Sequence, residues 1–185
     1  MLVEEALECL DPERSGGRGV DIGTGSGAIP IALLRERPTL SMDAVDLSVE
    51  ALEVADRNAR RHGVGERIRF LHGHLDEPVR GEPPYDLVTA NLPYIPTDEV
   101  ATLPTGVRDF EPRLALDGGA DGLGLLASLM ARADSLLAPG GAMVLEVGIG
   151  QAAALSRMAE TSSLGPARVR KDYSGNERVV VLRRR

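Results

Sequence analysis

The sequence predicts a doubly wound α/β fold built on a mostly parallel sheet, and three observations support this prediction. Short apolar runs typical of buried strands alternate with stretches of helical periodicity along the chain. A glycine-rich loop joins the first predicted strand to a helix, as in a βαβ unit. Two final strand patterns flank Ser174-Gly175-Asn176, which predicts a terminal antiparallel hairpin.

Boundary residues divide the first half of the chain into alternating elements. Asp11-Pro12 ends the first helix, Pro38 ends the second, and Ser48 is suited to cap the third. Pro30 falls in the first turn of the second helix, where a missing N–H costs little. We expect helices at 2–10, at 28–37 and between Ser48 and Gly63, and strands at 19–22, 40–45, 67–71 and 86–90.

The pattern is less regular after residue 90. Residues 91–121 show little periodicity, and irregular segments of this length are usually lids or binding loops. The remaining chain returns to alternating patterns. We expect helices at 123–137 and 151–160, a tight turn at 139–141, and strands at 142–147, 168–173 and 178–182.

Length and composition limit the class of protein. The 185 residues suffice for one domain with a substantial core, and the net charge of −7 argues against a dedicated duplex nucleic-acid binder. Cys9 is the only cysteine, so no intrachain disulfide is possible, which fits a reducing cytoplasm. No apolar run approaches the roughly 20 residues of a membrane span. His62 and His72 have no partners at metal-ligand spacing, so we expect no metal.

The glycine-rich loop and the end of the second strand form a nucleoside-binding pattern. Gly23, Gly25 and Gly27 allow a tight turn and a close approach of a ligand to the backbone. Asp46 ends the second strand, where a carboxylate can accept hydrogen bonds from both ribose hydroxyls. Gly23, Gly25 and Ala28 also satisfy the dinucleotide fingerprint, so this pattern predicts a nucleoside without specifying which one.

Residues 91–94 directly follow the fourth predicted strand, at the sheet edge where ligands of α/β proteins bind. The side-chain carbonyl of Asn91 and the backbone carbonyl of Leu92 can each accept one N–H of a planar amide or amino group. Pro93 makes the turn rigid, and Tyr94 can stack on the flat group. Such a site would hold a poorly nucleophilic nitrogen in line with a methyl donor, which is catalysis by positioning.

Four motifs together resemble the protein-(glutamine-N5) methyltransferases that modify peptide chain release factors. They are Asp21-Ile-Gly-Thr-Gly-Ser-Gly, Val45-Asp-Leu-Ser, Asn91-Leu-Pro-Tyr-Ile-Pro and Glu111-Pro-Arg-Leu-Ala-Leu-Asp-Gly-Gly-Ala-Asp-Gly-Leu, and the last is the most specific. The resemblance covers essentially the whole chain. It implies a seven-stranded class I methyltransferase sheet, S-adenosylmethionine as cofactor, and the glutamine of a Gly-Gly-Gln motif in a class I release factor as acceptor.

The resemblance also implies roles for individual residues. Residues 91–94 would hold the acceptor amide, and the segment 107–122 would shape its pocket, with no atom assigned to Glu111 or Arg113. Asp21 would face the cationic methionine end of the cofactor. The full set implied to bind the cofactor is Asp21, Gly23, Thr24, Gly25, Ser26, Gly27, Asp46, Leu47, His74, Leu75 and Asn91.

The sequence departs from the family pattern in three places. The family tetrad is usually Asn-Pro-Pro-Tyr, whereas Leu92 occupies the second position here. An acidic residue is usual where His74 stands. The N-terminal helical domain of the family has no counterpart in the 185 residues, so we expect a single methyltransferase domain over 1–185.

Three other functions compete with glutamine methylation. The same tetrad would serve a nucleic-acid N-methyltransferase acting on a flipped-out base, although the acidic charge and the last motif count against it. Leu92 and His74 also fit a non-catalytic cofactor-binding module. A dinucleotide oxidoreductase is the fourth hypothesis. For the favoured one, we expect a release factor as partner, no membrane, no stable nucleic-acid binding and a cytoplasmic location.

Overall fold

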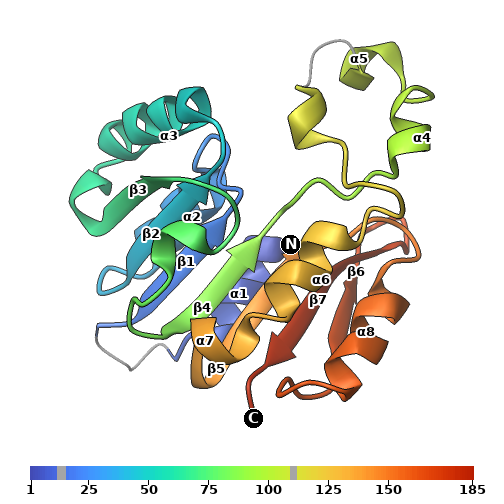
Figure 1. Ribbon diagram of the computed structural model, residues 1–185. Helices are drawn as coiled ribbons and strands as arrows, with labels where there is room; N and C mark the ends of the chain where they lie inside the picture. Colours follow the sequence, from blue (N-terminus) through green and yellow to red (C-terminus); the bar gives the residue numbers. More distant parts are fainter. Residues whose placement is uncertain (12–15, 109–111) are drawn as a thin grey trace.

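The computed structural model describes residues 1–11, 16–108 and 112–185, and its centre is one seven-stranded sheet (Figure 1). The strand order is β3-β2-β1-β4-β5-β7-β6. Strands β1 to β5 are parallel, and β7 runs antiparallel to both β5 and β6. The strands are β1 (Arg18–Ile22), β2 (Ser41–Asp46), β3 (Ile68–His72), β4 (Tyr85–Ala90), β5 (Leu137–Glu146), β6 (Arg168–Lys171) and β7 (Glu177–Arg183). The doubly wound α/β prediction with a terminal hairpin is confirmed.

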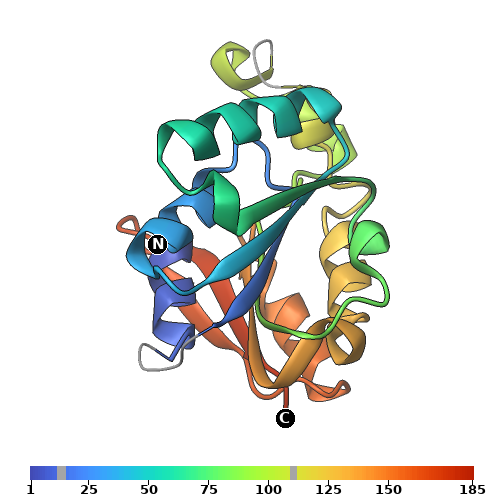
Figure 2. The ribbon, with the colours of Figure 1, turned by 90° about the vertical axis from the view of Figure 1, so that its left-hand side faces the viewer.

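Helices cover both faces of the sheet, giving three layers (Figures 1 and 2). One face is covered by α1 and α2 with α3 beside them, and the other by α6, α7 and α8. These helices are α1 (Leu2–Cys9), α2 (Ala28–Glu36), α3 (Val49–Arg61), α6 (Gly124–Met130), α7 (Ala133–Leu136) and α8 (Ala152–Glu160), with the 3₁₀ turns η1 (Gly65–Arg67) and η2 (Glu77–Val79) beside β3. No helix in the described part of the chain is long and apolar enough to span a bilayer.

Alternation along the strands sends side chains into two cores. In β5, Met143 and Leu145 pack towards α6 and α8, while Ala142 and Val144 pack towards α1 and α2. The residues of both sets are fully buried. Parallel strands covered on both faces therefore appear in the sequence as continuous apolar runs, which is why they were predictable.

Two elements differ from their predictions. The helix predicted at 123–137 is broken into α6 and α7, because Arg132 leaves helical geometry and its Nε donates to Asp76 Oδ2 at 3.1 Å. The turn predicted at 139–141 lies inside β5 instead of before it. Tyr85 pairs with Leu137 and Leu87 with Ala142, so the intervening residues of β5 form a bulge in a continuing strand.

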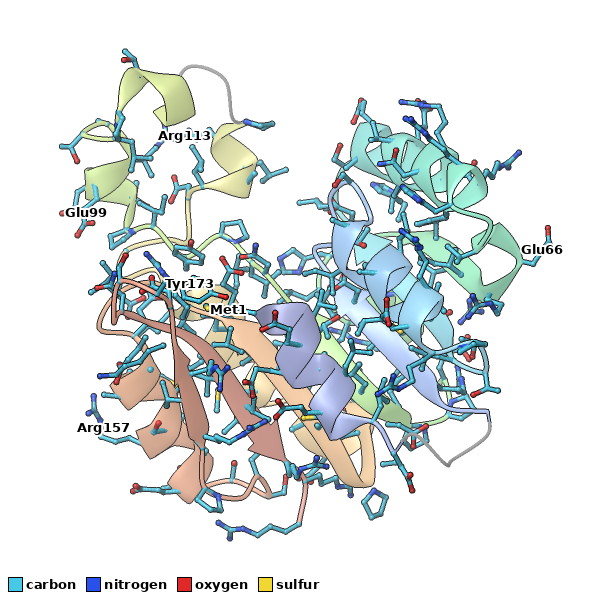
Figure 3. All side chains as sticks on the ribbon, turned by 180° about the vertical axis from the view of Figure 1, so that it is seen from behind. Met1, Glu66, Glu99, Arg113, Arg157 and Tyr173 are labelled. Atoms are coloured by element: carbon cyan, nitrogen blue, oxygen red, sulfur yellow. The ribbon has the colours of Figure 1, made fainter. Side chains whose placement is uncertain are left out.

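The segment after β4 leaves the carboxyl edge of the sheet and returns to it (Figure 1). Expected to be irregular, it contains the short helices α4 (Thr97–Val100) and α5 (Thr105–Arg108) and the 3₁₀ turn η3 (Arg113–Ala115). Glu99 and Arg113 mark the projecting part in Figure 3, far from Glu66 beside β3. The predicted motif residue Glu111 lies outside the described residues.

Candidate active site

The glycine loop connects β1 to α2 through three residues in the left-handed region of backbone geometry. Gly23, Gly25 and Gly27 have φ values of 72°, 54° and 78°. The N–H groups of Gly23 and Thr24 donate to the carbonyl of Val45 in β2, at 2.9 and 3.0 Å. A Cβ atom on Gly25 would meet nothing within 4 Å, so the centre of the loop is open to a ligand.

Asp46 at the end of β2 fixes this loop. Its Oδ2 accepts a hydrogen bond from the N–H of Gly25 at 2.7 Å, and its Oδ1 accepts one from the N–H of Ser48 at 2.9 Å. Ser48 in turn caps α3, with its Oγ accepting from the N–H of Ala51 at 3.1 Å. A carboxylate offers about four lone-pair sites, so Asp46 retains the capacity to accept ribose hydroxyls.

Asp21 is a fully buried carboxyl group immediately before the loop. Burial raises its pKa to about 7, although the Thr89 hydroxyl, which donates to Oδ1 at 2.6 Å, opposes the shift. The Thr24 hydroxyl also lowers this pKa, but neither its Oγ1 nor Asp21 Oδ2 makes a hydrogen bond of ordinary length and angle in the described part of the chain. These two atoms and the open glycine loop fit a ligand that supplies cationic and polar groups.

The Asn91–Leu92–Pro93–Tyr94 turn lies directly beside this loop because β4 is the neighbour of β1 in the sheet. Leu92 is 5% exposed and belongs to the core. Its Cδ2 lies 2.9 Å from the position of a Cβ on Gly23, and the φ of 72° at Gly23 also favours glycine there. Packing against the glycine loop therefore anchors this turn at the position where the family tetrad usually has a proline.

Tyr94 is half-buried at the end of the turn. Burial raises the pKa of its phenol, and the nearby carboxylate of Glu146 raises it further. Burial also raises the pKa of Glu146 itself. Tyr94 thus stays protonated near neutral pH and offers a flat, uncharged ring at the site.

The 117–122 stretch packs against the back of the turn. The N–H of Gly118 donates to the carbonyl of Ile95 at 2.8 Å, and the N–H of Ile95 donates to the carbonyl of Leu116 at 3.1 Å. A Cβ on Gly118 would lie 2.6 Å from the carbonyl oxygen of Pro93. A Cβ on Gly122 would collide with the carbonyl oxygen of Tyr94. The glycines of the last sequence motif therefore let two backbones meet.

Of the other residues predicted to bind the cofactor, Leu47 follows β2, His74 and Leu75 follow β3, and Ser26 lies in the glycine loop. Leu47 and His74 are exposed at this edge, and Leu75 is partly buried with φ of 47°, a strained value for a residue with a side chain. His72, which was not predicted as a site residue, places Nε2 3.1 Å from the carbonyl oxygen of Leu47. Ser26 is exposed, and its carbonyl accepts from Asn58 Nδ2 at 2.9 Å.

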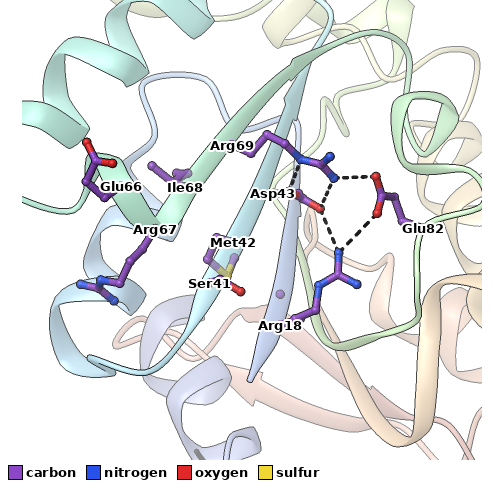
Figure 4. Close-up of a pocket in the computed structure, with 10 residues that line it drawn as sticks. Arg18, Ser41, Met42, Asp43, Glu66, Arg67, Ile68, Arg69 and Glu82 are labelled. Carbon is purple, nitrogen blue, oxygen red and sulfur yellow. Dashed lines mark hydrogen bonds and ion pairs between the residues drawn. The ribbon is translucent and has the colours of Figure 1, made fainter. Parts of the chain in front are cut away.

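A cavity of about 310 Å³ lies at the opposite, amino-terminal edge of the sheet (Figure 4). Four of its charged groups pair with one another: Arg69 donates to Asp43 at 2.8 and 2.9 Å and to Glu82 at 2.8 Å. Arg18 lies 3.6 Å from Asp43 and 3.7 Å from Glu82. Because these charges neutralise each other, we assign this cavity a structural role.

A family profile described as "Methyltransferase small domain" matches residues 5–104, more than half of the chain. The chain belongs to this methyltransferase family. Its members' chemistry implies S-adenosylmethionine as methyl donor, and the open glycine loop, Asp46 and the unpaired oxygen of Asp21 fit that molecule. No group of three or more potential metal ligands occurs among the described residues.

Curated relatives resemble the chain along most of its length. The "Release factor glutamine methyltransferase" of Rhodospirillum rubrum is 44% identical over 184 residues, covering 100% of this chain and 55% of the relative. The protein with the same name from Gloeobacter violaceus is 44% identical over 168 residues, covering 90% of this chain and 58% of the relative. The chain thus spans little more than half the length of these relatives.

Solved structures share the fold. TrmN from Thermus thermophilus is 28% identical with a TM-score of 0.69, covering 98% of this chain and 48% of that one. A ribosomal protein L11 methylase from Lactobacillus delbrueckii has a TM-score of 0.69 at 20% identity, covering 100% of this chain and 77% of that one, and so supports the fold alone. The sheet is that of the class I methyltransferases.

Sequence reasoning missed Thr89 and Gln151, and it assigned no contact to Gly118 and Gly122 within the predicted 107–122 segment. Thr89 holds Asp21, and Gly118, Gly122 and Gln151 pack against or bond to the turn. The glycines stand in a motif already identified as specific, and their spacing could have suggested a close backbone contact. The partners of Thr89 and Gln151 lie 68 and 57 residues away, so no local pattern indicates them.

Proposed function

We propose that this chain transfers a methyl group from S-adenosylmethionine to the side-chain amide nitrogen of a glutamine in a class I peptide chain release factor. The observation that supports this most directly is the contact between Leu92 and Gly23, which joins a turn suited to an amide to a loop suited to the cofactor. The names of the relatives supply the acceptor class.

In this proposal the chain's own residues act by positioning. The Asn91 side-chain carbonyl and the Leu92 backbone carbonyl accept the two N–H groups of the glutamine amide, and the Tyr94 ring stacks on its plane. S-adenosylmethionine supplies a methyl carbon on a positively charged sulfur that is a good leaving group. The two acceptors keep the nitrogen lone pair directed at that carbon and stabilise the positive charge that grows on nitrogen. The amide proton is lost to water after transfer.

The cofactor would be held by the groups of the first two strands. Asp46 would accept the ribose hydroxyls, the open centre of the loop at Gly25 would contact the ligand backbone to backbone, and Asp21 would face the cationic methionine end. Leu47, His74 and Leu75 would flank the adenine. Ionised Asp21 is the form that attracts a cation, which makes its raised pKa relevant to binding.

Labelled methyl transfer to a purified release factor tests this proposal. The matched acceptor is the same factor with the glutamine of its Gly-Gly-Gln motif changed to alanine, and an RNA oligonucleotide forms a third arm. We expect label on the first acceptor alone. Label on the RNA would replace the proposal with base methylation, and bound cofactor without transfer to any acceptor would indicate a binding module.

The proposal also includes a cytoplasmic location and a protein, not a nucleic acid, as the stable partner. An acceptor that belongs to translation places the enzyme in the cytoplasm. The net charge of −7 supports a protein acceptor over a stable nucleic-acid complex. Centrifugation of a lysate, followed by detection of the chain in the soluble and membrane fractions, checks the location.

A further inference from the structure

Gln151 is a buried polar residue at the start of α8, outside the predicted site. It is 8% exposed and lies immediately after the loop that follows β5. A buried amide needs partners for both its oxygen and its nitrogen, because each would otherwise lose its hydrogen bonds to water. The partners that Gln151 has belong to three separate segments of the chain.

The side-chain amide of Gln151 is fully engaged. Its Oε1 accepts a hydrogen bond from the N–H of Gly148 at 2.8 Å, in the β5–α8 loop. Its Nε2 donates to the carbonyl of Tyr94 at 2.9 Å and to the carbonyl of Asp121 at 3.4 Å. One side chain therefore links the acceptor turn, the 117–122 stretch and the end of β5.

The residues around the Gln151 side-chain amide are closely packed. A Cβ on Gly148 would lie 3.1 Å from both Gln151 Oε1 and Tyr94 Cδ2. A Cβ on Gly122 would lie 2.6 Å from Gln151 Nε2. Glycines at both positions thus allow the amide to reach Tyr94, and the contact depends on close packing as well as on hydrogen bonds.

We propose that Gln151 is a positioning residue for methyl transfer, holding the backbone of Tyr94 so that the turn keeps its shape against the acceptor. The inference rests on the proposed function, because it assigns Gln151 an effect on the acceptor amide. Tyr94 lies four residues past the end of β4, where sheet hydrogen bonds no longer fix it. The N–H of the peptide that joins Tyr94 to Ile95 donates to Leu116, and Gln151 adds the restraint on the carbonyl of the same peptide.

Only a primary amide satisfies all three partners at this position. Methionine has a similar length and volume but leaves the Tyr94 and Asp121 carbonyls without a donor. Glutamate keeps an acceptor for Gly148 but loses both donors and directs a negative charge at two carbonyl oxygens. Gln151→Met and Gln151→Glu therefore remove the same restraint in different ways.

Steady-state methyl transfer with the two variants tests the role, with Ser156→Ala as control. Ser156 lies on the same helix and its Oγ donates to the carbonyl of Ala152 at 2.8 Å, so this variant loses a hydrogen bond of α8 without touching the turn. We expect kcat/KM for the acceptor to fall about 10- to 100-fold in both Gln151 variants. Cofactor Kd should stay within about threefold, and Ser156→Ala should match the wild type.

The three tyrosines of the chain provide a readout that needs no transfer. Incorporated 3-fluorotyrosine gives one fluorine resonance each for Tyr85, Tyr94 and Tyr173, and Tyr94→Phe identifies the second. In Gln151→Met and Gln151→Glu, we expect the Tyr94 resonance to shift or broaden while the other two stay unchanged. A role confined to folding would move all three together.

The outcomes separate this inference from the proposed function. If the wild type methylates the release factor and both Gln151 variants match it, Gln151 is not a positioning residue. A loss of transfer fully explained by weaker cofactor binding also overturns the inference. If the wild type methylates nothing, the proposed function fails, and an unperturbed Tyr94 resonance in the variants would then overturn the positioning role as well.

Discussion

At the scale of single residues, Asn91 is exposed at the carboxyl end of β4, and its backbone carbonyl lies 3.8 Å from the position of a Cβ on Gly23. Replacing Asn91 with alanine would remove one of the two acceptors that we propose for the amide N–H groups. We expect methyl transfer to fall about 100-fold or more, with cofactor affinity within about tenfold of the wild type.

Radiolabel transfer and calorimetry measure these two quantities for Asn91→Ala. Ser135→Ala removes a side-chain hydrogen bond within α7, which precedes the amino end of β5, and should leave both unaltered. Normal transfer by Asn91→Ala would contradict the assignment of the tetrad.

Asp21 predicts a pH dependence with opposite signs for binding and stability. Since burial raises its pKa to about 7, the group is protonated below that pH and loses its attraction for a cationic ligand. Cofactor affinity should weaken by up to about tenfold per pH unit as pH falls below 7. The unliganded chain should behave inversely: the contribution of Asp21 to the free energy of unfolding is largest below pH 3.8 and is lost as pH rises through 7.

Calorimetric titration between roughly pH 5.5 and 8.5 measures the first effect, and urea unfolding across the same range measures the second. Asp21→Asn keeps the shape and removes the charge, so its affinity should be lower and flat with pH. A wild-type affinity independent of pH would rule out Asp21 as the group that faces the cationic end.

Residues close in sequence were predictable because their chemistry is local. The glycine loop and residues 91–94 can be identified from their residue types and from their position directly after a predicted strand. Gln151 does not, since its role depends on a contact across 57 residues. The packing of Leu92 against the glycine loop could not be predicted either, because the sequence gives the residue type but not its neighbours in space.

At the scale of elements, the Gly118–Gly122 return forms the wall behind the acceptor turn. Gly122 has φ of 70°, and a Cβ there would collide with the Tyr94 carbonyl. We expect Gly122→Ala to lower the free energy of unfolding by about 1–3 kcal/mol and to reduce transfer by displacing Tyr94.

Gly124→Ala is the matched control, two residues further along. A Cβ at Gly124 meets nothing within 4 Å, and the residue begins α6, where alanine is the better helix former. Denaturant unfolding and transfer assays compare the two variants. Equal effects of Gly122→Ala and Gly124→Ala would contradict a specific requirement for the close contact between Gly122 and Tyr94.

The elements that sequence patterns missed are those whose geometry depends on distant partners. The apolar periodicity of 123–137 continues through Arg132, but α6 ends at Met130 and α7 begins at Ala133, and Arg132 between them donates to Asp76. Pro139-Gly140-Gly141 has the composition of a turn, yet Leu137 and Ala142 on either side of it pair with β4, and Gly140 and Gly141 form backbone hydrogen bonds with Arg184. The residue types at 139–141 do not indicate that these residues form a bulge within a strand.

At the scale of the whole molecule, the amino edge of the sheet contributes to stability, whereas the candidate site lies at the carboxyl edge. The amino edge is tied together by Asp43, which accepts from Arg69 and, at 2.5 Å, from the hydroxyl of the buried Tyr85. Burial alone would raise the pKa of Asp43, but these hydrogen bonds and the positive charges of Arg69 and Arg18 hold it below its ordinary value.

Asp43→Asn should therefore lower the free energy of unfolding by about 1.5–3 kcal/mol near neutral pH, with little change in cofactor affinity. The wild-type advantage is present above the ordinary Asp pKa and disappears as pH falls through the lowered value, so acid should bring the two proteins together. Urea titrations at several pH values measure this difference. A loss of cofactor binding in Asp43→Asn would contradict the separation of the two edges.

Strand order has a consequence for synthesis. β7 is translated after β5 and β6, yet in the sheet it lies between them. Until residue 183 has emerged, the edge of β5 remains unpaired, and its apolar residues offer a template to other nascent chains. The sheet is thus completed only after β7 has been translated, because β6 joins the sheet through its pairing with β7.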